Sequence, residues 1–159
     1  MNKILTIEQA ERLSKKLRSE GKKIVLVGGC FDILHPGHVL FLEKAKQQGD
    51  VLFVMLESDQ TIQLTKGNKR PIHPQKDRAL VLSTLNMVDY IILLPSLNKD
   101  RDYDNLLFKI KPTIIATTKG DPKRYHKERQ AKLMGTTVID VMERVKDAST
   151  SQLTKLLSI

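Results

Sequence analysis

Cysteine, long apolar runs and a secretory leader are absent or nearly so, and each absence excludes a class of protein. Cys30 is the one cysteine in 159 residues, so no disulfide can form within the chain, and we expect a reducing, cytoplasmic environment. No apolar run approaches the roughly 20 residues that a membrane-spanning helix needs, so a membrane is not an expected partner. The N-terminus lacks the pattern of a secretory signal. Internal repeats and glycine–serine linkers are missing too, and we expect a single domain over residues 1–159.

The composition is that of a globular chain with a basic surface. Hydrophobic residues make up 40% and charged residues 28%, which is typical of chains that bury a core. The 27 basic and 18 acidic residues give a net charge of +9, which suits nucleotides, sugar phosphates or nucleic acid. The charged stretch 119–132 has one aromatic residue, Tyr125, whereas a platform for stacking nucleic-acid bases needs more. We therefore interpret this stretch as a solvated helix and do not expect nucleic acid as a partner.

Short apolar runs alternate with amphipathic stretches along the chain. The runs predict five strands buried on both faces, at about residues 24–27, 51–56, 90–94, 113–117 and 136–141. Helices are expected at about residues 7–19, 37–48, 74–87, 103–110 and 123–134 and from 149 onward, and a polar loop at 57–73. The alternation indicates an α/β fold: a Rossmann-like, doubly wound five-stranded parallel sheet with helices on both faces. The helix within residues 1–21 is expected to cover a sheet edge or to contribute to an interface.

The fold class predicts where a ligand binds. In open parallel sheets, ligands bind beyond the carboxyl ends of the strands, at the switch point. Residues 28–38, 57–70, 95 onward, 117–121 and 143–149 are therefore expected to form the site.

The segment Gly29-Cys30-Phe31-Asp32-Ile33-Leu34-His35-Pro36-Gly37-His38 follows the first predicted strand and carries the strongest signal. Gly28 and Gly29 leave room for a phosphate to approach the backbone, and the helix start near Gly37 offers unpaired N–H groups. His35 and His38 can both point at one anion. Two histidines near a glycine are common, and a metal site would need further ligands that no nearby residue suggests. Neither a Walker A loop nor a Gly-x-Gly-x-x-Gly fingerprint is present.

Residues 29–38 resemble the signature of the cytidylyltransferase-like nucleotidyltransferases. Within that superfamily the chain, from about Lys22 onward, most resembles the heptose-1-phosphate adenylyltransferase domain, to which glycerol-3-phosphate cytidylyltransferase and archaeal FAD synthetase are related. Further stretches agree with family motifs in order and spacing: Glu57-Ser58-Asp59, Lys66-Gly67, Arg70-Pro71, Asp77-Arg78, Gly120-Asp121, Arg144 and Asp147 to Ser151.

Three stretches depart from the heptose pattern. Val27-Gly28-Gly29 replaces Thr-Asn-Gly, and Thr118-Lys119-Gly120-Asp121 replaces Lys-Gly-Gly-Asp. In the closing motif, Asp147 replaces a glycine and Ser151 replaces a threonine. These departures bear on the acceptor more than on the chemistry.

The resemblance implies a reaction in which the acceptor phosphate attacks the α-phosphorus of a nucleoside triphosphate and pyrophosphate leaves. It also implies the roles of individual residues. The catalytic residues would be His35, His38, Lys66 and Arg144. The nucleotide-binding residues would be Gly28, Gly29, Cys30, Phe31, Asp32, Gly37, Gly120, Asp121, Ser149 and Thr150. The acceptor-binding residues would be Asp59 and Arg78, and Mg²⁺ would bridge the phosphates. A homodimer is expected because small members of the family commonly pair.

Several of these residues have a second interpretation. Lys66 is equally well explained as an exposed loop lysine. Asp32 either orders the glycine turn or touches the ligand, and Phe31 is favoured as a core residue. A cation at a helix start is unfavourable without a bound anion, which is why Arg78 is assigned to the acceptor. Cys30 is interpreted as a small buried residue, since no base is placed to activate it, and His73 and His126 as surface residues.

Three functions follow in order of preference. The first is transfer of a nucleoside monophosphate, from ATP in preference, to a phosphorylated sugar or alcohol. The second is a cytidylyltransferase acting on glycerol 3-phosphate or a similar polyol phosphate. The third is a nucleotide- or RNA-binding module without turnover.

Overall fold

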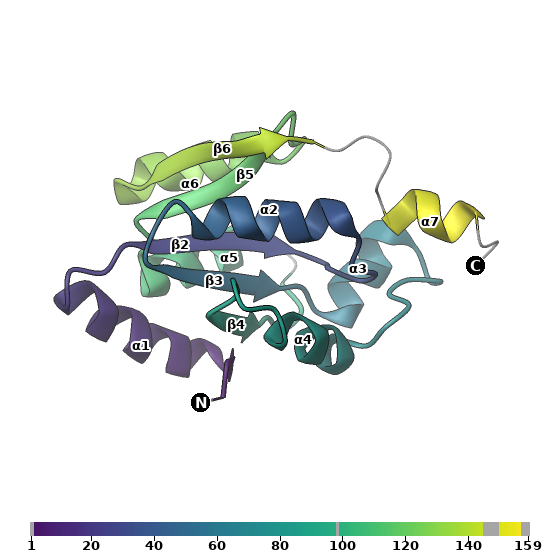
Figure 1. Ribbon diagram of the computed structural model, residues 1–159, viewed down its shortest axis with the longest axis horizontal. Helices are drawn as coiled ribbons and strands as arrows, with labels where there is room; N and C mark the ends of the chain where they lie inside the picture. Colours follow the sequence, from purple (N-terminus) through teal and green to yellow (C-terminus); the bar gives the residue numbers. More distant parts are fainter. Residues whose placement is uncertain (1, 98, 145–149, 157–159) are drawn as a thin grey trace.

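The computed structural model describes residues 2–97, 99–144 and 150–156, and its strands form one parallel sheet (Figure 1). The doubly wound α/β fold is confirmed, with six strands where the sequence predicted five. The sheet order is β1-β4-β3-β2-β5-β6. The strands are β1 (Ile4–Leu5), β2 (Ile24–Gly29), β3 (Val51–Leu56), β4 (Tyr90–Leu93), β5 (Ile114–Lys119) and β6 (Thr137–Glu143). The extra strand, β1, has two residues and pairs with the edge of β4, which is too short a run for periodicity to reveal.

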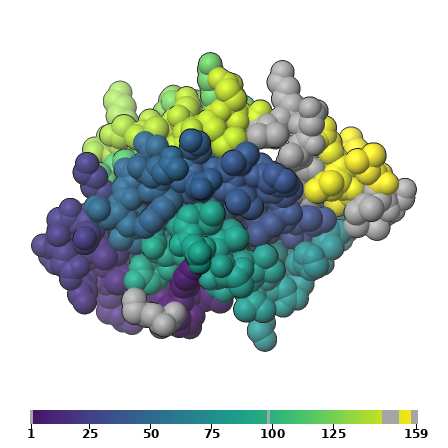
Figure 2. All heavy atoms as spheres, viewed as in Figure 1, coloured from purple at the N-terminus to yellow at the C-terminus, as the bar shows by residue number. Residues whose placement is uncertain are grey.

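Helices cover both faces of the sheet, and two further helices lie beyond the carboxyl ends of the strands. One face carries α2 (Pro36–Lys46) and α4 (Gln75–Ser83), which lie over the sheet in the space-filling view (Figure 2). The other carries α1 (Ile7–Ser19), α5 (Asp100–Ile110) and α6 (Arg124–Met134). The short helices α3 (Asp59–Lys66) and α7 (Thr150–Leu156) stand past the arrowheads in Figure 1.

Successive residues of the apolar strands face opposite sides of the sheet, so each strand contributes side chains to both hydrophobic cores. Val25 and Val27 of β2 face α2 and α4, whereas Ile24 and Leu26 face α1 and α5, and none of the four is more than 1% exposed. Each buried strand residue therefore stabilises the packing of one helical layer.

The N-terminal helix has the bounds that the sequence predicts. Thr6 and Gln9 form the expected capping box: the Thr6 hydroxyl accepts from the Gln9 N–H at 3.3 Å, and the Gln9 amide oxygen accepts from the Thr6 N–H at 2.8 Å. Ala10, Leu13 and Leu17 pack into the core beneath the sheet, so α1 covers a face of the sheet while β1 extends its edge. The second predicted capping box involves Ser149, which lies outside the described residues.

The segment predicted as a polar loop, residues 57–73, contains α3 (Asp59–Lys66), and that part of the prediction was wrong. The Ser58 hydroxyl caps its first turn by accepting from the N–H three residues later, at 3.1 Å. Ile62 is the fully buried apolar residue of this helix, so it lacks the repeated apolar face that periodicity detects. Gly67 ends the helix with a φ of 91°, a conformation that favours glycine.

The strand order places the topological switch point between β2 and β5. Within the sheet, β3 and then β4 follow on one side of β2, and the chain then crosses over so that β5 and β6 lie on the other side of β2. The crevice that ligands use in such sheets therefore opens between the segments that follow Gly29 and Lys119.

The turn after β2 brings the backbone of Gly29 close to the ring of Phe31. Phe31 has a φ of 45° and is 4% exposed, and its ring packs into the core between the sheet and α2. A methyl group at Gly29 would lie 2.8 Å from that ring, whereas at Gly28 it would meet the Met55 side chain at an ordinary 3.4 Å. Gly29 is therefore needed for packing, and Gly28 is not.

We expect Gly29→Ala to lower the free energy of unfolding by about 1–3 kcal/mol, because the added methyl group overpacks the Phe31 ring. Gly28→Ala is the matched control and should change it by less than about 0.5 kcal/mol. Urea unfolding of both variants measures the difference. Equal midpoints for the two variants would contradict this account of the turn.

Candidate active site

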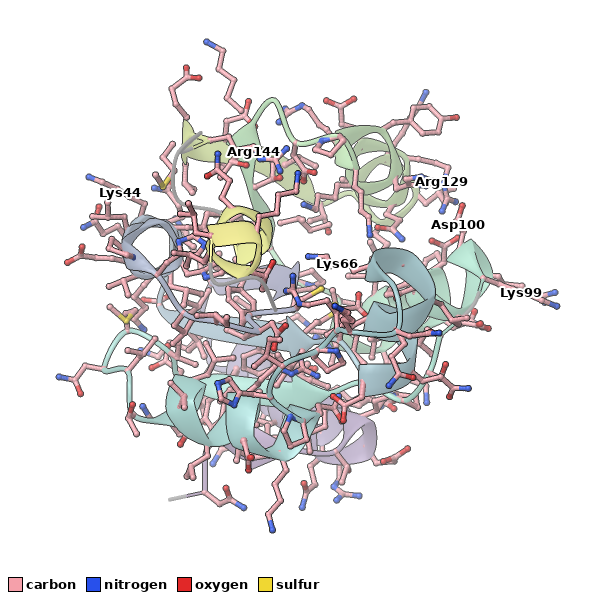
Figure 3. All side chains as sticks on the ribbon, turned by 90° about the vertical axis from the view of Figure 1, so that its right-hand side faces the viewer. Lys44, Lys66, Lys99, Asp100, Arg129 and Arg144 are labelled. Atoms are coloured by element: carbon pink, nitrogen blue, oxygen red, sulfur yellow. The ribbon has the colours of Figure 1, made fainter. Side chains whose placement is uncertain are left out.

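The segments predicted to form the site gather at one end of the molecule. Because all the strands are parallel, the ends of β2, β3, β5 and β6 lie along the same edge of the sheet. Figure 3 views this edge, with Lys66 at the end of α3 and Arg144 just after β6. Both are exposed, and their roles in catalysis remain predictions.

Two stacked imidazoles stand at the start of α2. His35 is the residue before the helix, and its carbonyl accepts from the N–H groups of His38 at 2.9 Å and Val39 at 3.3 Å. The two histidine rings stack with centroids 3.8 Å apart, and the Phe31 ring lies 5.1 Å from that of His38. Pro36 occupies the first helical turn, where its missing N–H costs nothing. The motif thus presents both imidazoles beside a helix N-terminus, as the sequence predicts.

Both histidines are poised to remain neutral at neutral pH. Burial lowers the pKa of His35. Burial, followed by the charges of His35 and Lys66, lowers the pKa of His38 to about 4, although a hydrogen bond to the backbone of Ile33 works against the shift. The charge of Lys66, the last residue of α3, acts on His38, and its role in the site stays a prediction.

Two unsatisfied polar atoms lie together on the stacked histidines. Among the described residues, buried side-chain nitrogen or oxygen atoms without a hydrogen-bond partner are found at His35 Nδ1, His38 Nδ1 and one terminal nitrogen of Arg70. Buried polar groups in proteins are nearly always paired, so such a cluster calls for a ligand. An anion beside the stacked histidines would satisfy their Nδ1 atoms and would favour the protonated imidazole.

Asp32 anchors the loop after α3. Its carboxylate accepts from the Arg70 Nε at 2.5 Å and from the backbone N–H groups of Ile72 at 2.9 Å and His73 at 3.0 Å. Burial would raise the pKa of Asp32, but these hydrogen bonds and the Arg70 charge lower it overall. The Asp32 carboxylate is therefore committed within the chain, but to the loop at residues 70–73 and not to the glycine turn that the sequence analysis named. Arg70 is a site residue that the sequence analysis left without a role.

Arg78 is corrected from an acceptor-binding to a positioning role. Its side chain is fully buried, although it lies in the first turns of α4. The guanidinium donates to three backbone carbonyls, those of His73 at 2.9 Å, Cys30 at 2.5 Å and Glu57 at 2.8 Å. It also pairs with the Asp59 carboxylate at 2.7 Å. Protein oxygens rather than a ligand phosphate therefore compensate this cation.

Asp59 retains one carboxylate oxygen for other contacts. Arg78 binds its Oδ1, and its side chain is 40% exposed at the first turn of α3. Its contact with an acceptor stays a prediction.

The turn after β5 is held by the half-buried carboxylate of Asp121. Asp121 accepts from the Thr117 hydroxyl at 2.6 Å and from the Lys123 N–H at 2.8 Å, and it pairs with Lys127. Burial would raise the pKa of Asp121, but the hydrogen bonds from Lys127, Thr117 and Lys123 lower it to about 2. Asp121 therefore shapes the turn, and the exposed Gly120, with a φ of 79°, presents the backbone to the crevice.

The remaining predicted residues are placed as follows. Gly28, Gly29 and Gly37 flank the histidines, and Cys30 is half-buried. Thr150 begins α7, and Ser149 lies outside the described residues. His73 and His126 are exposed, as expected. Within residues 2–97, 99–144 and 150–156, no cluster of three or more histidine, cysteine or acidic residues could hold a metal ion. The helices in those ranges include none long and apolar enough to cross a membrane.

The sequence analysis did not predict one contact between side chains at this edge. The Tyr103 hydroxyl of α5 donates to both carboxylate oxygens of Glu57, at 3.1 and 3.0 Å. Glu57 directly follows β3, which was a signal for a site residue, whereas Tyr103 was interpreted as part of an apolar helix face.

Comparison with known sequences identifies similar proteins. Residues 26–155 match the cytidylyltransferase-like family. A bifunctional protein HldE from Nitratiruptor sp. is 46% identical over 112 residues, and one from Wolinella succinogenes is 45% identical over 113 residues. These matches cover 70% and 71% of this chain but 23% of each relative, so the chain spans about a quarter of their length.

Two solved structures share the fold. The lipopolysaccharide core biosynthesis protein from Thermoplasma volcanium is 30% identical, with a TM-score of 0.62 over 79% of this chain and 98% of that one. The pantoate–β-alanine ligase from Francisella tularensis has a TM-score of 0.66 over 98% of this chain and 78% of that one. At 19% identity it shows the fold alone.

The lowered pKa of His38 predicts loss of stability in acid. The unfolded chain takes up a proton near the ordinary value of 6.5, whereas the folded chain does so near 4. The free energy of unfolding should therefore fall by about 3 kcal/mol as the pH drops from 6.5 to 4. His38→Ala should show a shallower fall over the same range, and denaturant unfolding at several pH values checks this. Parallel pH profiles would contradict a depressed pKa.

Proposed function

Because this chain belongs to the cytidylyltransferase-like family, we propose that it is a nucleotidyltransferase acting on a small phosphorylated sugar or alcohol. It would transfer a nucleoside monophosphate from a nucleoside triphosphate, with ATP favoured, and release pyrophosphate. The observation that carries the proposal is the pair of buried, unpaired nitrogens on the stacked His35 and His38 at the N-terminus of α2. A triphosphate is the ligand of this family that would satisfy them together.

The proposed reaction needs positioning and charge stabilisation rather than a strong base. An oxygen of the acceptor phosphate attacks the α-phosphorus, and the bond from that phosphorus to the bridging oxygen of the β-phosphate breaks. Pyrophosphate leaves with the electron pair, so atoms and charge balance without a proton transfer. The imidazoles of His35 and His38 would donate to phosphate oxygens as charge builds up, and Lys66 would add a positive charge beside them.

Mg²⁺ enters this proposal as part of the nucleotide substrate. The carboxylates of Asp32 and Asp121 are already held in ion pairs within the chain. Phosphate oxygens and water would therefore supply most ligands of the ion, as is usual for Mg²⁺. The proposal also includes a homodimer and a cytoplasmic location, which gel filtration and cell fractionation test.

Similar proteins support a sugar phosphate as the acceptor. The HldE relatives are bifunctional proteins, and the region that they share with this chain is the one that resembles heptose-1-phosphate adenylyltransferase. The Thermoplasma relative, which matches over almost its whole length, acts in lipopolysaccharide core biosynthesis. Heptose 1-phosphate with ATP is therefore the first pair to assay, and glycerol 3-phosphate with CTP is the second.

We expect pyrophosphate release with ATP and a sugar 1-phosphate when each nucleoside triphosphate is tested against a panel of phosphorylated acceptors. Release with CTP alone would refute the adenylyl preference. Binding of ATP without release for any pair would favour a nucleotide-binding module.

A substitution tests the role of the histidine pair in the same assay. His38→Ala should lower kcat by about 10²–10³-fold, the cost of losing one donor to the developing charge. His126→Ala is the matched control, since His126 is exposed and lies far along the chain on α6. Circular dichroism would establish that both variants fold, and unchanged turnover of a folded His38→Ala enzyme would remove His38 from the mechanism.

A further inference from the structure

Glu57 stands at the edge of the sheet beside the nucleotide loop. It directly follows β3, and its N–H donates to the carbonyl of Gly29 at 3.1 Å. That hydrogen bond continues the parallel register in which Gly29 faces Leu56, so Glu57 lies alongside Cys30. The backbone of Glu57 therefore lies beside the start of the segment that leads to His35 and His38, at the edge where ligands bind, and its carboxylate points toward α5.

Within the part of the chain that the structure describes, the carboxylate of Glu57 is hydrogen-bonded by one side chain, from the helix layer that contains α5. The Tyr103 hydroxyl of α5 has one proton and shares it between Oε1 and Oε2, at 3.1 and 3.0 Å. Burial raises the pKa of Glu57, although the Tyr103 hydrogen bond and the charges of Lys123 and Arg78 lower part of the shift. The Glu57 carboxylate therefore loses hydration free energy on burial, and its neighbours compensate for only part of that loss.

A purely structural role in joining the end of β3 to α5 does not explain why residue 57 carries a carboxylate. α5 already packs under the sheet through Leu106, Leu107 and Ile110, each no more than 3% exposed. An apolar pair in place of Glu57 and Tyr103 would join the same two elements without the solvation cost. Polar groups that are retained at a ligand-binding edge despite such a cost indicate a binding role.

The pair has unused capacity to bind hydrogen-bond donors. An ionised carboxylate offers about four lone-pair sites, and among the residues that the structure describes the one shared proton from Tyr103 leaves at least two of them open. The tyrosine oxygen can accept a further hydrogen bond itself. Two adjacent acceptors on one carboxylate match neighbouring hydroxyl groups on a carbon chain or ring.

The charges around Glu57 favour a neutral donor over a cation. The guanidinium of Arg78 contacts the backbone carbonyl of Glu57, and the positive charges of Lys123 and Arg78 both act on its carboxylate. An ammonium ligand would be repelled by the charge of Lys123, whereas hydroxyl groups would not. A phosphate group would be repelled by the carboxylate and drawn instead toward the basic residues and imidazoles.

We propose that Glu57 and Tyr103 determine acceptor specificity by binding hydroxyl groups of the sugar or polyol part of the phosphorylated acceptor. The inference rests on the proposed function and specifies its acceptor. The acceptor would lie with its hydroxyls on Glu57 and its phosphate toward His35 and His38. A site built around hydroxyl recognition discriminates strongly against analogues that lack the hydroxyl.

Steady-state kinetics of Glu57→Gln and Tyr103→Phe test the proposal. Glu57→Gln keeps the size of the side chain but replaces one acceptor oxygen with a donor. We expect the KM for a sugar phosphate acceptor to rise by about 10–100-fold, while the KM for the nucleoside triphosphate changes less than about twofold. Tyr103→Phe should act in the same direction with a smaller effect. For a deoxy acceptor lacking the recognised hydroxyl, wild type and Glu57→Gln should differ much less.

Controls separate a binding role from a structural one. Glu43→Gln, an exposed carboxylate of α2, should leave both KM values unchanged. Thermal unfolding of each variant would verify that it is folded at the assay temperature. An unchanged acceptor KM in folded Glu57→Gln would overturn the inference while leaving the proposed function intact, and so would equal increases in both KM values. Absence of turnover by the wild type with every pair would overturn the proposed function and the inference together.

Discussion

The guanidinium of Arg78 is withdrawn from solvent at the point where the ends of β2 and β3, the start of α3 and the loop before α4 meet. It donates to the carbonyls of Cys30, Glu57 and His73 and pairs with Asp59. Each of these carbonyls belongs to a residue that lies outside the helices and strands. Removing the cation would leave buried acceptors unpaired in several segments at once, which is among the costlier defects a protein can carry. The positions of the loops around the crevice therefore depend on this one buried side chain.

A second buried ion pair extends the same scaffold to the histidine loop. Asp32, in that loop, is bound by Arg70 and by two backbone N–H groups from the loop before α4. These ion pairs thus fix the loops around the crevice. The imidazoles of His35 and His38 and one nitrogen of Arg70 have atoms without a hydrogen-bond partner among the described residues, and these can bind a ligand. The low pKa of His38 comes first from its burial and then from the charges of His35 and Lys66. A triphosphate supplies the missing negative charge, so binding and a favourable electrostatic environment arise together.

The sequence predicts the layers of this fold well because apolar periodicity encodes them, and α1 and β3 have the predicted bounds. It misses α3, whose single buried apolar residue leaves no periodic face, and β1, whose two residues give no pattern. The histidine motif is recognisable because residue type and spacing suffice to place it. The roles of Arg78 and Asp32 could not be predicted in the same way, since each depends on distant backbone atoms that only the folded chain brings near. The pair of Glu57 and Tyr103 joins residues 46 positions apart for the same reason.

We propose that the unpaired imidazole nitrogens at the start of α2 bind the triphosphate of the nucleotide. A crystal structure of the protein with a nucleoside triphosphate analogue that resists cleavage between the α- and β-phosphates, together with Mg²⁺, tests it most directly. The account predicts phosphate oxygens within hydrogen-bond distance of the His35 and His38 imidazoles, with the nucleoside extending toward Gly120 and β6. A nucleotide bound elsewhere, or bound here with both imidazoles turned away from its phosphates, would contradict it.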